Sequence, residues 1–310
     1  MSMTKKMISL IIPTFNEDGN ILNVYKAIKQ IVPSRYEAEI IFVDDGSTDD
    51  TIKIIKKCSI NDDRIHYISF TRNFGQQYAL KAGIDHAHGD AVITLDADLE
   101  HPPALIPTMI KEWEGKIDLV LTKRREDPNL PYYKRLSSRL FYRLINLLSD
   151  VHISENSPDF RLMDRKVVDM IKNSQESTLF FRGLVMWGGY STKSITYDQH
   201  TRSWGKSKYN FAKMLRLAID AITSFSILPL RLATILGFGM SMLTGIYGIY
   251  AIIAWFTNWH VITGWPSVII SVLFIGGLQL LILGIIGEYI GKIYLETKHR
   301  PQYLVKEKSL

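Results

Sequence analysis

Apolar positions in the first 122 residues alternate between two periods, which predicts alternating strands and helices. Short β-branched runs predict strands at Ile8–Ile12, Glu39–Asp44, Ile65–Phe70, Ala91–Asp96 and Ile117–Thr122. Helical spacing of apolar residues predicts helices between them, at Ile21–Ile31, Thr51–Lys57, Gln77–His86 and Ala104–Trp113. Alternation of this kind indicates βαβ units, and we therefore expect an α/β domain with a mostly parallel sheet.

The pattern changes in the second half of the chain. Residues 123–200 are less regular and contain one basic helical stretch, from Tyr132 to Leu148. Residues 209–228 place apolar side chains at a helical period with cations elsewhere, which predicts an amphipathic helix at a membrane interface. Residues 232–291 then contain a single charged residue, Glu288, a distribution that excludes an ordinary soluble globular protein.

This nearly uncharged region divides into two runs, each long enough to cross a bilayer, for which about 20 helical residues are needed. We expect transmembrane helices at about 232–256 and 266–290, within a hairpin over 229–291. Trp259 and Trp265 border the connection, where aromatic side chains are typical of a membrane boundary. The alternative is a helical hairpin buried in a soluble core.

Charges beside the hairpin predict its orientation. Lys and Arg residues precede the first span and follow the second, and the connection has none. The positive-inside rule then places the α/β domain, over 1–208, and a tail over 292–310 in the cytoplasm. Too few apolar residues follow the N-terminus to predict a signal peptide. Small residues recur every four positions at Gly237, Ser241 and Gly245 and again at Gly287 and Gly291, which predicts that the hairpin packs on itself or contacts a second copy of the chain.

Composition narrows the chemistry. The net charge of +6 suits a surface that faces anionic phosphates or lipid headgroups, and no nucleic-acid-reading motif accompanies it. The single cysteine, Cys58, excludes a disulfide framework and a cysteine-based zinc site. The sequence also lacks a dinucleotide-binding G-x-G-x-x-G after the first strand, a complete P-loop and an H-E-x-x-H zinc motif.

Acidic residues stand where two predicted strands end. Asp44 and Asp45 close the second strand, and Asp96 and Asp98 close the fourth. Ligands of open α/β sheets bind beyond this edge, and carboxylate oxygens suit Mg²⁺ or Mn²⁺ bound to a substrate phosphate. Both motifs also have purely structural interpretations: the Asp-x-Asp pair as a helix cap, and residues 44–48 as a turn followed by a helix cap.

Basic residues gather in two segments. Residues 123–143 hold seven basic and two acidic residues, and residues 200–216 hold five basic and none acidic. Such segments are often solvated or headgroup-facing surfaces. The segment 202–208 lies directly before the interfacial helix, so that a phosphate on a lipid would meet its cations there.

Taken together, these motifs resemble the polyprenyl-phosphate glycosyltransferases of inverting glycosyltransferase family 2, the bactoprenol glucosyltransferase and dolichol-phosphate mannose synthase group. The resemblance covers nearly the whole chain. Its motifs are residues 12–17, 43–49, 72–75, 96–103, 159–162, 202–208 and 287–301. It implies a Rossmann-like glycosyltransferase A-type domain ahead of the interfacial helix and hairpin.

Carried over position by position, the resemblance implies three groups of site residues. The nucleotide-sugar group is Pro13, Asn16, Glu17, Asp44, Asp45 and Asp96; the metal group is Asp96 and Asp98; the lipid-phosphate group is Arg124, Arg135, Arg139, Arg202, Lys206 and Lys208. Asp98, Asp159 and Arg202 are the expected catalytic residues. Asp159 acts as a base or orients the acceptor, or is simply held by Arg161. Glu100, where relatives often have Gln, is a further candidate metal contact.

The implied reaction is inverting, metal-dependent transfer of a hexose, with UDP-glucose as the favoured donor, to polyprenyl (undecaprenyl) phosphate on the cytoplasmic face of a bacterial inner membrane. The alternatives are another sugar such as GDP-mannose, a membrane-tethered nucleotide-binding regulator without turnover, and a transporter. The expected partners are the nucleotide sugar, the lipid phosphate, membrane lipid, a second copy of the chain, a flippase and a downstream glycosyltransferase. Nucleic acid is not expected.

Overall fold

A computed structural model describes residues 5–125, 158–174, 176, 179–198, 222–223, 226–256 and 264–310. The predicted basic helix at 132–148 and nearly all of the predicted interfacial helix lie outside this part of the chain. Five residues expected at the lipid phosphate also lie outside it: Arg135, Arg139, Arg202, Lys206 and Lys208.

The α/β domain is built on one mixed sheet of eight described strands, in the order β7-β5-β6-β4-β1-β2-β3-β8. The strands are β1 Met7–Thr14, β2 Glu37–Asp44, β3 Ile65–Phe70, β4 Ala91–Thr94, β5 Leu119–Arg124, β6 Arg161–Asp164, β7 Thr192–Tyr197 and β8 Val305–Lys308. The helices are α1 Asp18–Ile28, α2 Thr51–Asn61, α3 Gln76–His86, the short 3₁₀ helix Pro103–Leu105, α4 Ile106–Glu114, α6 Arg165–Asn173, α7 Phe181–Trp187, α9 Leu228–Phe256 and α10 Trp265–Thr297.

The expected βα units are confirmed, and their strands form the middle of the sheet. Strands β1 to β4 run parallel to one another, whereas β6 runs antiparallel between β4 and β5. Strands β6, β7 and β8 were not expected. β7 and β8 are polar, largely exposed strands at the two edges of the sheet, so they lack the apolar run by which a buried strand is recognised.

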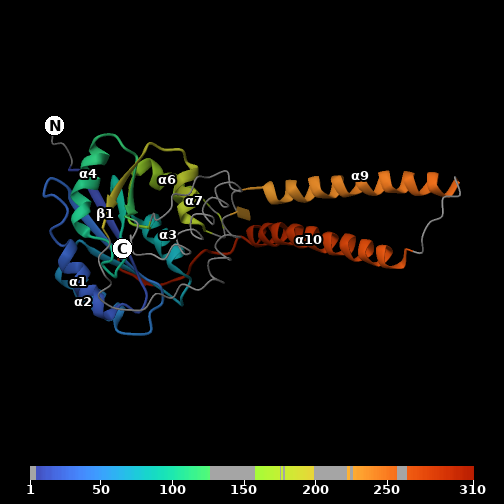
Figure 1. Cartoon of the computed structure of the whole chain (residues 1–310). Helices are drawn as coiled ribbons and strands as arrows, with labels where there is room; N and C mark the ends of the chain where they lie inside the picture. The colour runs from blue at the N-terminus through green and yellow to red at the C-terminus, as the bar shows by residue number, and fades with distance from the viewer. Residues whose placement is uncertain are drawn as a thin grey trace.

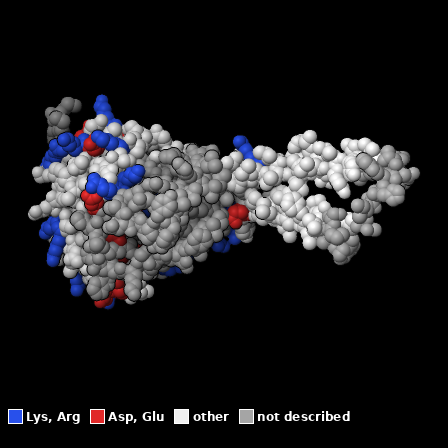
Figure 2. Space-filling view, viewed as in Figure 1, with Lys and Arg blue, Asp and Glu red and all other residues white. Residues whose placement is uncertain are grey.

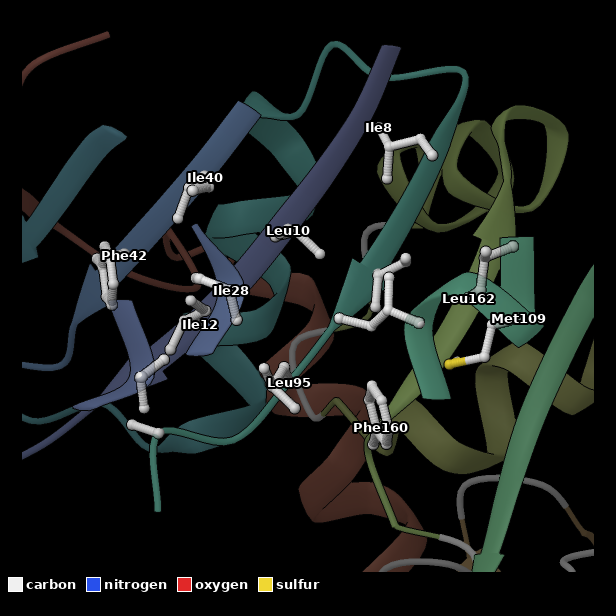
Figure 3. Close-up of a cluster of buried hydrophobic side chains, with 14 of the residues drawn as sticks. Ile8, Leu10, Ile12, Ile28, Ile40, Phe42, Leu95, Met109, Phe160 and Leu162 are labelled. Carbon is white, nitrogen blue, oxygen red and sulfur yellow. The ribbon is translucent and has the colours of Figure 1, made fainter. Parts of the chain in front are cut away.

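Helices cover both faces of the sheet (Figure 1). Ile8, Leu10 and Ile12 of β1 pack in one cluster with α1, α2 and α4, which Figure 3 shows in part. Ile11, between them, packs on the other face with α3, α6 and α7. Successive side chains of a strand point to opposite faces, so the consecutive apolar residues Leu10, Ile11 and Ile12 of β1 fill both layers.

Two long helices extend side by side from the α/β domain (Figure 1). They contain apolar spans, Leu228–Tyr250 and Ile270–Thr297, that are long enough to cross a membrane. Only 6% and 0% of the residues in their most apolar windows are buried. On the hairpin itself, Figure 2 shows charged residues only near its junction with the α/β domain. The alternative of a hairpin inside a soluble core is therefore wrong, because these apolar side chains face outward.

The small residues of the hairpin do not bring its helices together. A side chain added at Gly237, Gly245, Gly287 or Gly291 would meet no atom within 4 Å. The interpretation that they pack the hairpin on itself is wrong, and contact with a second copy of the chain remains a prediction.

The chain returns to the sheet after the hairpin. Helix α10 continues to Thr297, and β8 then pairs antiparallel with β3. The segment expected as a tail over 292–310 is thus helix at its start and a strand of the α/β domain's sheet near its end. β8 has the sequence Val-Lys-Glu-Lys, which lacks the alternating apolar positions of a half-buried strand, so only its pairing with β3 identifies it as a strand.

Candidate functional site

A cavity of about 410 Å³ opens at the carboxyl ends of β1, β2 and β4. Parallel strands bring these ends to one edge of the sheet, which is where open α/β sheets bind ligands. The residues that line the cavity are Pro13, Thr14, Phe15, Glu17, Asp45, Asn73, Gly75, Gln76, Ala79, Asp96, Ala97 and Asp98. Five residues predicted for the nucleotide or the metal are among them: Pro13, Glu17, Asp45, Asp96 and Asp98.

Asn16 and Asp44, also predicted to contact the nucleotide, are not in the cavity wall. The Asn16 side-chain oxygen accepts a hydrogen bond from the Thr48 backbone N–H at 2.9 Å, and the Asn16 N–H donates to the Ser47 hydroxyl at 2.9 Å. Asp44 accepts hydrogen bonds from the Ser47 N–H at 3.0 Å and from the Ser69 hydroxyl at 2.7 Å. These side chains join neighbouring loops and thereby shape the cavity from behind.

Asp45 is the carboxylate of this pair that reaches the cavity, although it is only 3% exposed. It accepts hydrogen bonds from the backbone N–H groups of Phe74, at 2.7 Å, and Gly75, at 2.9 Å. Burial raises the pKa of Asp45 above its usual value, and the two N–H donors offset part of that increase. Asp45 therefore fastens the loop after β3 to the end of β2.

Gly46 allows that loop to approach. Its φ of +71° lies in the left-handed region, and a Cβ at this position would stand 2.4 Å from the carbonyl carbon of Arg72. Glycine is the residue that tolerates both conditions. Asp45 thus binds the loop after β3, and the absence of a side chain at Gly46 leaves space for that loop.

Asp96 is oriented by two side chains. Its oxygens accept hydrogen bonds from Gln76 Nε2 at 2.8 Å and, with Asp96 ionised, from His101 Nε2 at 3.1 Å. His101 is 1% exposed, stacks on Phe160 and places its Nδ1 2.5 Å from the Tyr197 hydroxyl. His101 lies in the sequence motif 96–103, whereas Gln76 and Tyr197 come from distant segments and carried no local signal.

Asp98 lies on the same cavity wall as Asp96. Its Oδ1 accepts a hydrogen bond from the Glu100 N–H at 3.1 Å, and Leu99, with a φ of +55°, makes the turn between them. The described residues contain no cluster of three or more His, Cys, Asp or Glu side chains suited to a metal ion. Two carboxylates on an open cavity nevertheless fit Mg²⁺ or Mn²⁺, which take their remaining ligands from water and substrate phosphate.

Glu100 and Arg124 form an ion pair beside this wall. Glu100 Oε2 lies 3.0 Å from Arg124 Nη2, and the Glu100 side chain is buried. This pairing accounts for Glu100 without a metal. Arg124, which was expected at the lipid phosphate, thus lies beside Glu100 and Tyr197. Burial raises the pKa of Tyr197, and Arg124 opposes that increase.

A buried charged cluster centres on Asp159. Asp159 Oδ1 lies 2.8 Å from Arg161 Nη2 and 3.1 Å from Arg182 Nε. Burial opposes ionisation, but the guanidiniums of Arg182 and Arg161 hold the pKa of Asp159 below its usual value. Burial also lowers the pKa of Arg161, to about 10. Arg161 was expected as a partner of Asp159, whereas Arg182, on α7, was not.

Comparison with known proteins shows extensive similarity. Residues 9–171 match the family described as Glycosyl transferase family 2. The chain is 43% identical over 303 residues to the bactoprenol glucosyl transferase of Shigella phage SfV, which covers 97% of this chain and 99% of the relative. It is 42% identical over 300 residues to the prophage bactoprenol glucosyl transferase homolog of Escherichia coli strain K12, covering 96% and 98%. A solved structure of glucosyl-3-phosphoglycerate synthase from Mycobacterium tuberculosis with Mn²⁺, UDP-glucose and phosphoglyceric acid aligns at 19% identity and a TM-score of 0.47, covering 71% of this chain and 79% of that chain.

Proposed function

This chain belongs to glycosyl transferase family 2 and is a glycosyltransferase, and we propose that it transfers glucose from UDP-glucose to polyprenyl phosphate, with inversion at the anomeric carbon. The family and the glycosyltransferase A-type fold that the motifs indicated are confirmed. One observation carries the proposal: Asp45, Asp96 and Asp98 share a cavity at the carboxyl edge of the sheet, in a chain that ends in two exposed apolar helices.

The cavity suits a nucleotide sugar. Pro13, Glu17 and Asp45 form the side at which the nucleoside would bind, and hydrogen-bonding carboxylates there suit hydroxyl and N–H donors. Asp96 and Asp98 would hold Mg²⁺ or Mn²⁺ against the diphosphate. The ion, when bound, neutralises the charge that develops on the leaving nucleoside diphosphate.

The acceptor needs little help with deprotonation. A phosphate monoester has a second pKa of about 6, so that its attacking oxygen is already anionic near neutral pH. Asp159, with its lowered pKa and two arginine partners, suits a positioning role better than that of a strong base. Asp159 also holds the Arg182 guanidinium in place, at 3.1 Å.

The hairpin would bring this site to the bilayer surface. Apolar helices with outward-facing side chains are stable in lipid, and polyprenyl phosphate cannot leave lipid. The basic residues Arg202, Lys206 and Lys208 would meet its phosphate, and the named activity of the phage relatives supports this acceptor class. We place the domain and both termini in the cytoplasm of a bacterium, with a flippase and a downstream glycosyltransferase using the product.

The test is sugar transfer by the full-length protein in lipid nanodiscs. The protein is incubated with undecaprenyl phosphate, Mn²⁺ or Mg²⁺, and labelled UDP-glucose, GDP-mannose or other nucleotide sugars, and the label in the lipid fraction is measured. We expect transfer from UDP-glucose that EDTA abolishes. Binding of the nucleotide sugar without any lipid labelling would instead support the regulator.

A pair of variants tests the metal residues. Asp98→Asn should abolish transfer while the protein remains folded, because the variant loses one of two anionic metal ligands. Asp63→Asn is the matched control, since Asp63 is an exposed carboxylate that precedes β3 at the opposite edge of the sheet. Full activity in Asp98→Asn would overturn the metal assignment.

The acceptor site is tested separately. Arg202→Ala should raise the KM for the lipid phosphate and leave the KM for UDP-glucose nearly unchanged, because the cation is proposed to contact the acceptor alone. Equal losses for both substrates would contradict this assignment.

A further inference from the structure

The C-terminal strand lies beside the loop that closes the donor cavity. Strand β8 pairs with β3 at Ile68 with Lys308, Ser69 with Glu307 and Phe70 with Val305, and the register shifts at Phe70. The pairing continues past the end of β3, because the Thr71 N–H donates to the Leu304 carbonyl at 3.0 Å. Residues 71–75, which we call the donor loop, begin at this hydrogen bond.

The donor loop contributes directly to the cavity. Asn73 and Gly75 line it, and the Phe74 and Gly75 N–H groups bind the Asp45 carboxylate. The backbone of Arg72 packs against Gly46. Any displacement of this loop would therefore move both a wall of the cavity and the hydrogen bonds that orient Asp45.

Tyr303 connects the C-terminal segment to the donor loop through a row of aromatic rings. The Tyr303 ring stacks on Phe70, with centroids 5.1 Å apart and an interplanar angle of 18°. Phe70 in turn meets Phe74 edge to face, with centroids 5.6 Å apart. Each such pair is favourable beyond its burial of apolar area, so Tyr303 supports the side chain of the residue whose N–H binds Asp45.

The Tyr303 hydroxyl fixes the other end of the ring. It donates a hydrogen bond to Asp85 Oδ2 at 2.9 Å, on α3, and burial raises the tyrosine pKa. Nearby, Lys56 on α2 pairs with Glu307 at 2.6 Å, and the Ser309 N–H donates to the Tyr67 carbonyl at 3.0 Å. The segment is thus attached to the sheet and to two helices, immediately after the helix α10.

From these contacts we propose that Tyr303 is a positioning residue for the donor site: through Phe70 and Phe74 it holds the donor loop in the conformation that orients Asp45 for the nucleotide. The inference rests on the proposed function, because it assumes that a nucleotide sugar occupies the cavity. It also gives the C-terminal segment a role, since the same few residues join the second apolar helix to the donor cavity.

The test compares three variants of the full-length protein in detergent micelles. Tyr303→Leu removes the aromatic stack, whereas Tyr303→Phe retains the ring and loses only the bond to Asp85. Leu304→Ala is the matched control, because the Leu304 side chain is 51% exposed and its backbone carbonyl is unaffected. UDP binding is measured by calorimetry with Mn²⁺ present, and transfer kinetics are measured for donor and acceptor. Thermal unfolding reports whether each variant is folded.

We expect Tyr303→Leu to weaken UDP binding and raise the donor KM about three- to tenfold, the range expected for one lost aromatic contact. Its acceptor KM and kcat should change little, and Tyr303→Phe and Leu304→Ala should bind UDP as the wild type does. A folded Tyr303→Leu protein with wild-type UDP affinity, or an equal rise in both KM values, would overturn the inference alone. Absence of UDP binding by the wild type would overturn the proposed function, and the inference with it.

Discussion

The His101 ring places its Nε2 3.1 Å from the carboxylate of Asp96, so a buried side chain orients a carboxylate at the mouth of the sheet. The other ring nitrogen contacts the hydroxyl of Tyr197, the last residue of β7. With Asp96 ionised, Nε2 carries the proton and Nδ1 accepts the tyrosine hydrogen bond. The cavity at the carboxyl ends of the strands is thereby connected to the edge strand that precedes the basic segment 202–208.

Replacement of His101 should weaken metal use. In His101→Phe, the stacking on Phe160 is retained but Asp96 loses its donor, so we expect the Mn²⁺ concentration for half-maximal transfer to rise about tenfold or more. His101→Gln, with an amide N–H near the Nε2 position, should recover part of the loss. Titration of transfer activity with Mn²⁺ measures both. An unchanged Mn²⁺ requirement in His101→Phe would show that Asp96 needs no such support.

A pair of glycines tests the close approach of the donor loop. Gly46→Ala should destabilise the protein by about 1–3 kcal/mol and weaken UDP binding, because its positive φ and its contact with Arg72 both exclude a methyl group. Gly19→Ala, in α1, meets no atom within 4 Å and should leave UDP binding unchanged. Unfolding midpoints and UDP calorimetry give the two measurements. Equal behaviour of the two variants would contradict the assigned role of Gly46.

The buried ion pair between Asp159 and Arg161 should be important for the stability of the fold. Arg161→Met should destabilise the protein by about 3–5 kcal/mol, because it removes a partner that is 2.8 Å away and leaves a buried carboxylate with less compensation. Adding Asp159→Asn to that variant should restore part of the stability. Denaturant unfolding of the full-length protein in detergent measures this. A single variant as stable as the wild type would contradict the interpretation.

Stability should also respond to acid through Asp62. Hydrogen bonds from Arg64, 2.7 Å away, lower the pKa of Asp62 from 3.8 to about 2. A lowered pKa means that the pair stabilises the fold above pH 4 and loses this contribution as the pH falls through 2. Asp62→Asn should therefore cost about 1 kcal/mol at pH 7, a value reduced by the partial exposure of Arg64.

The difference between wild type and Asp62→Asn should narrow between pH 4 and pH 2, as unfolding midpoints at a series of pH values will measure. Asp63→Asn, at the neighbouring exposed position, is the control and should show no such convergence. A difference that is constant with pH would show that the Asp62 carboxylate is not the group responsible.

Local sequence patterns are enough to predict the central strands, the apolar hairpin and the edge of the sheet at which the acidic residues gather. Ile65–Phe70 coincides with β3, and the predicted spans at about 232–256 and 266–290 lie within α9 and α10. Such features depend on periodicity and on the cost of placing charge in lipid, both of which are read from residues close together in the chain.

Which polar groups contact one another depends on how the whole chain folds. Asp44 and Asp45 are adjacent, yet one bonds to Ser69 behind the cavity and the other faces into it. Tyr303 reaches Phe70 across more than two hundred residues of sequence, as β8 completes the sheet beside β3. Successive side chains point in different directions, and folding brings distant segments within hydrogen-bonding range. Neither outcome can be predicted from the local sequence, because each depends on the partner that the fold supplies.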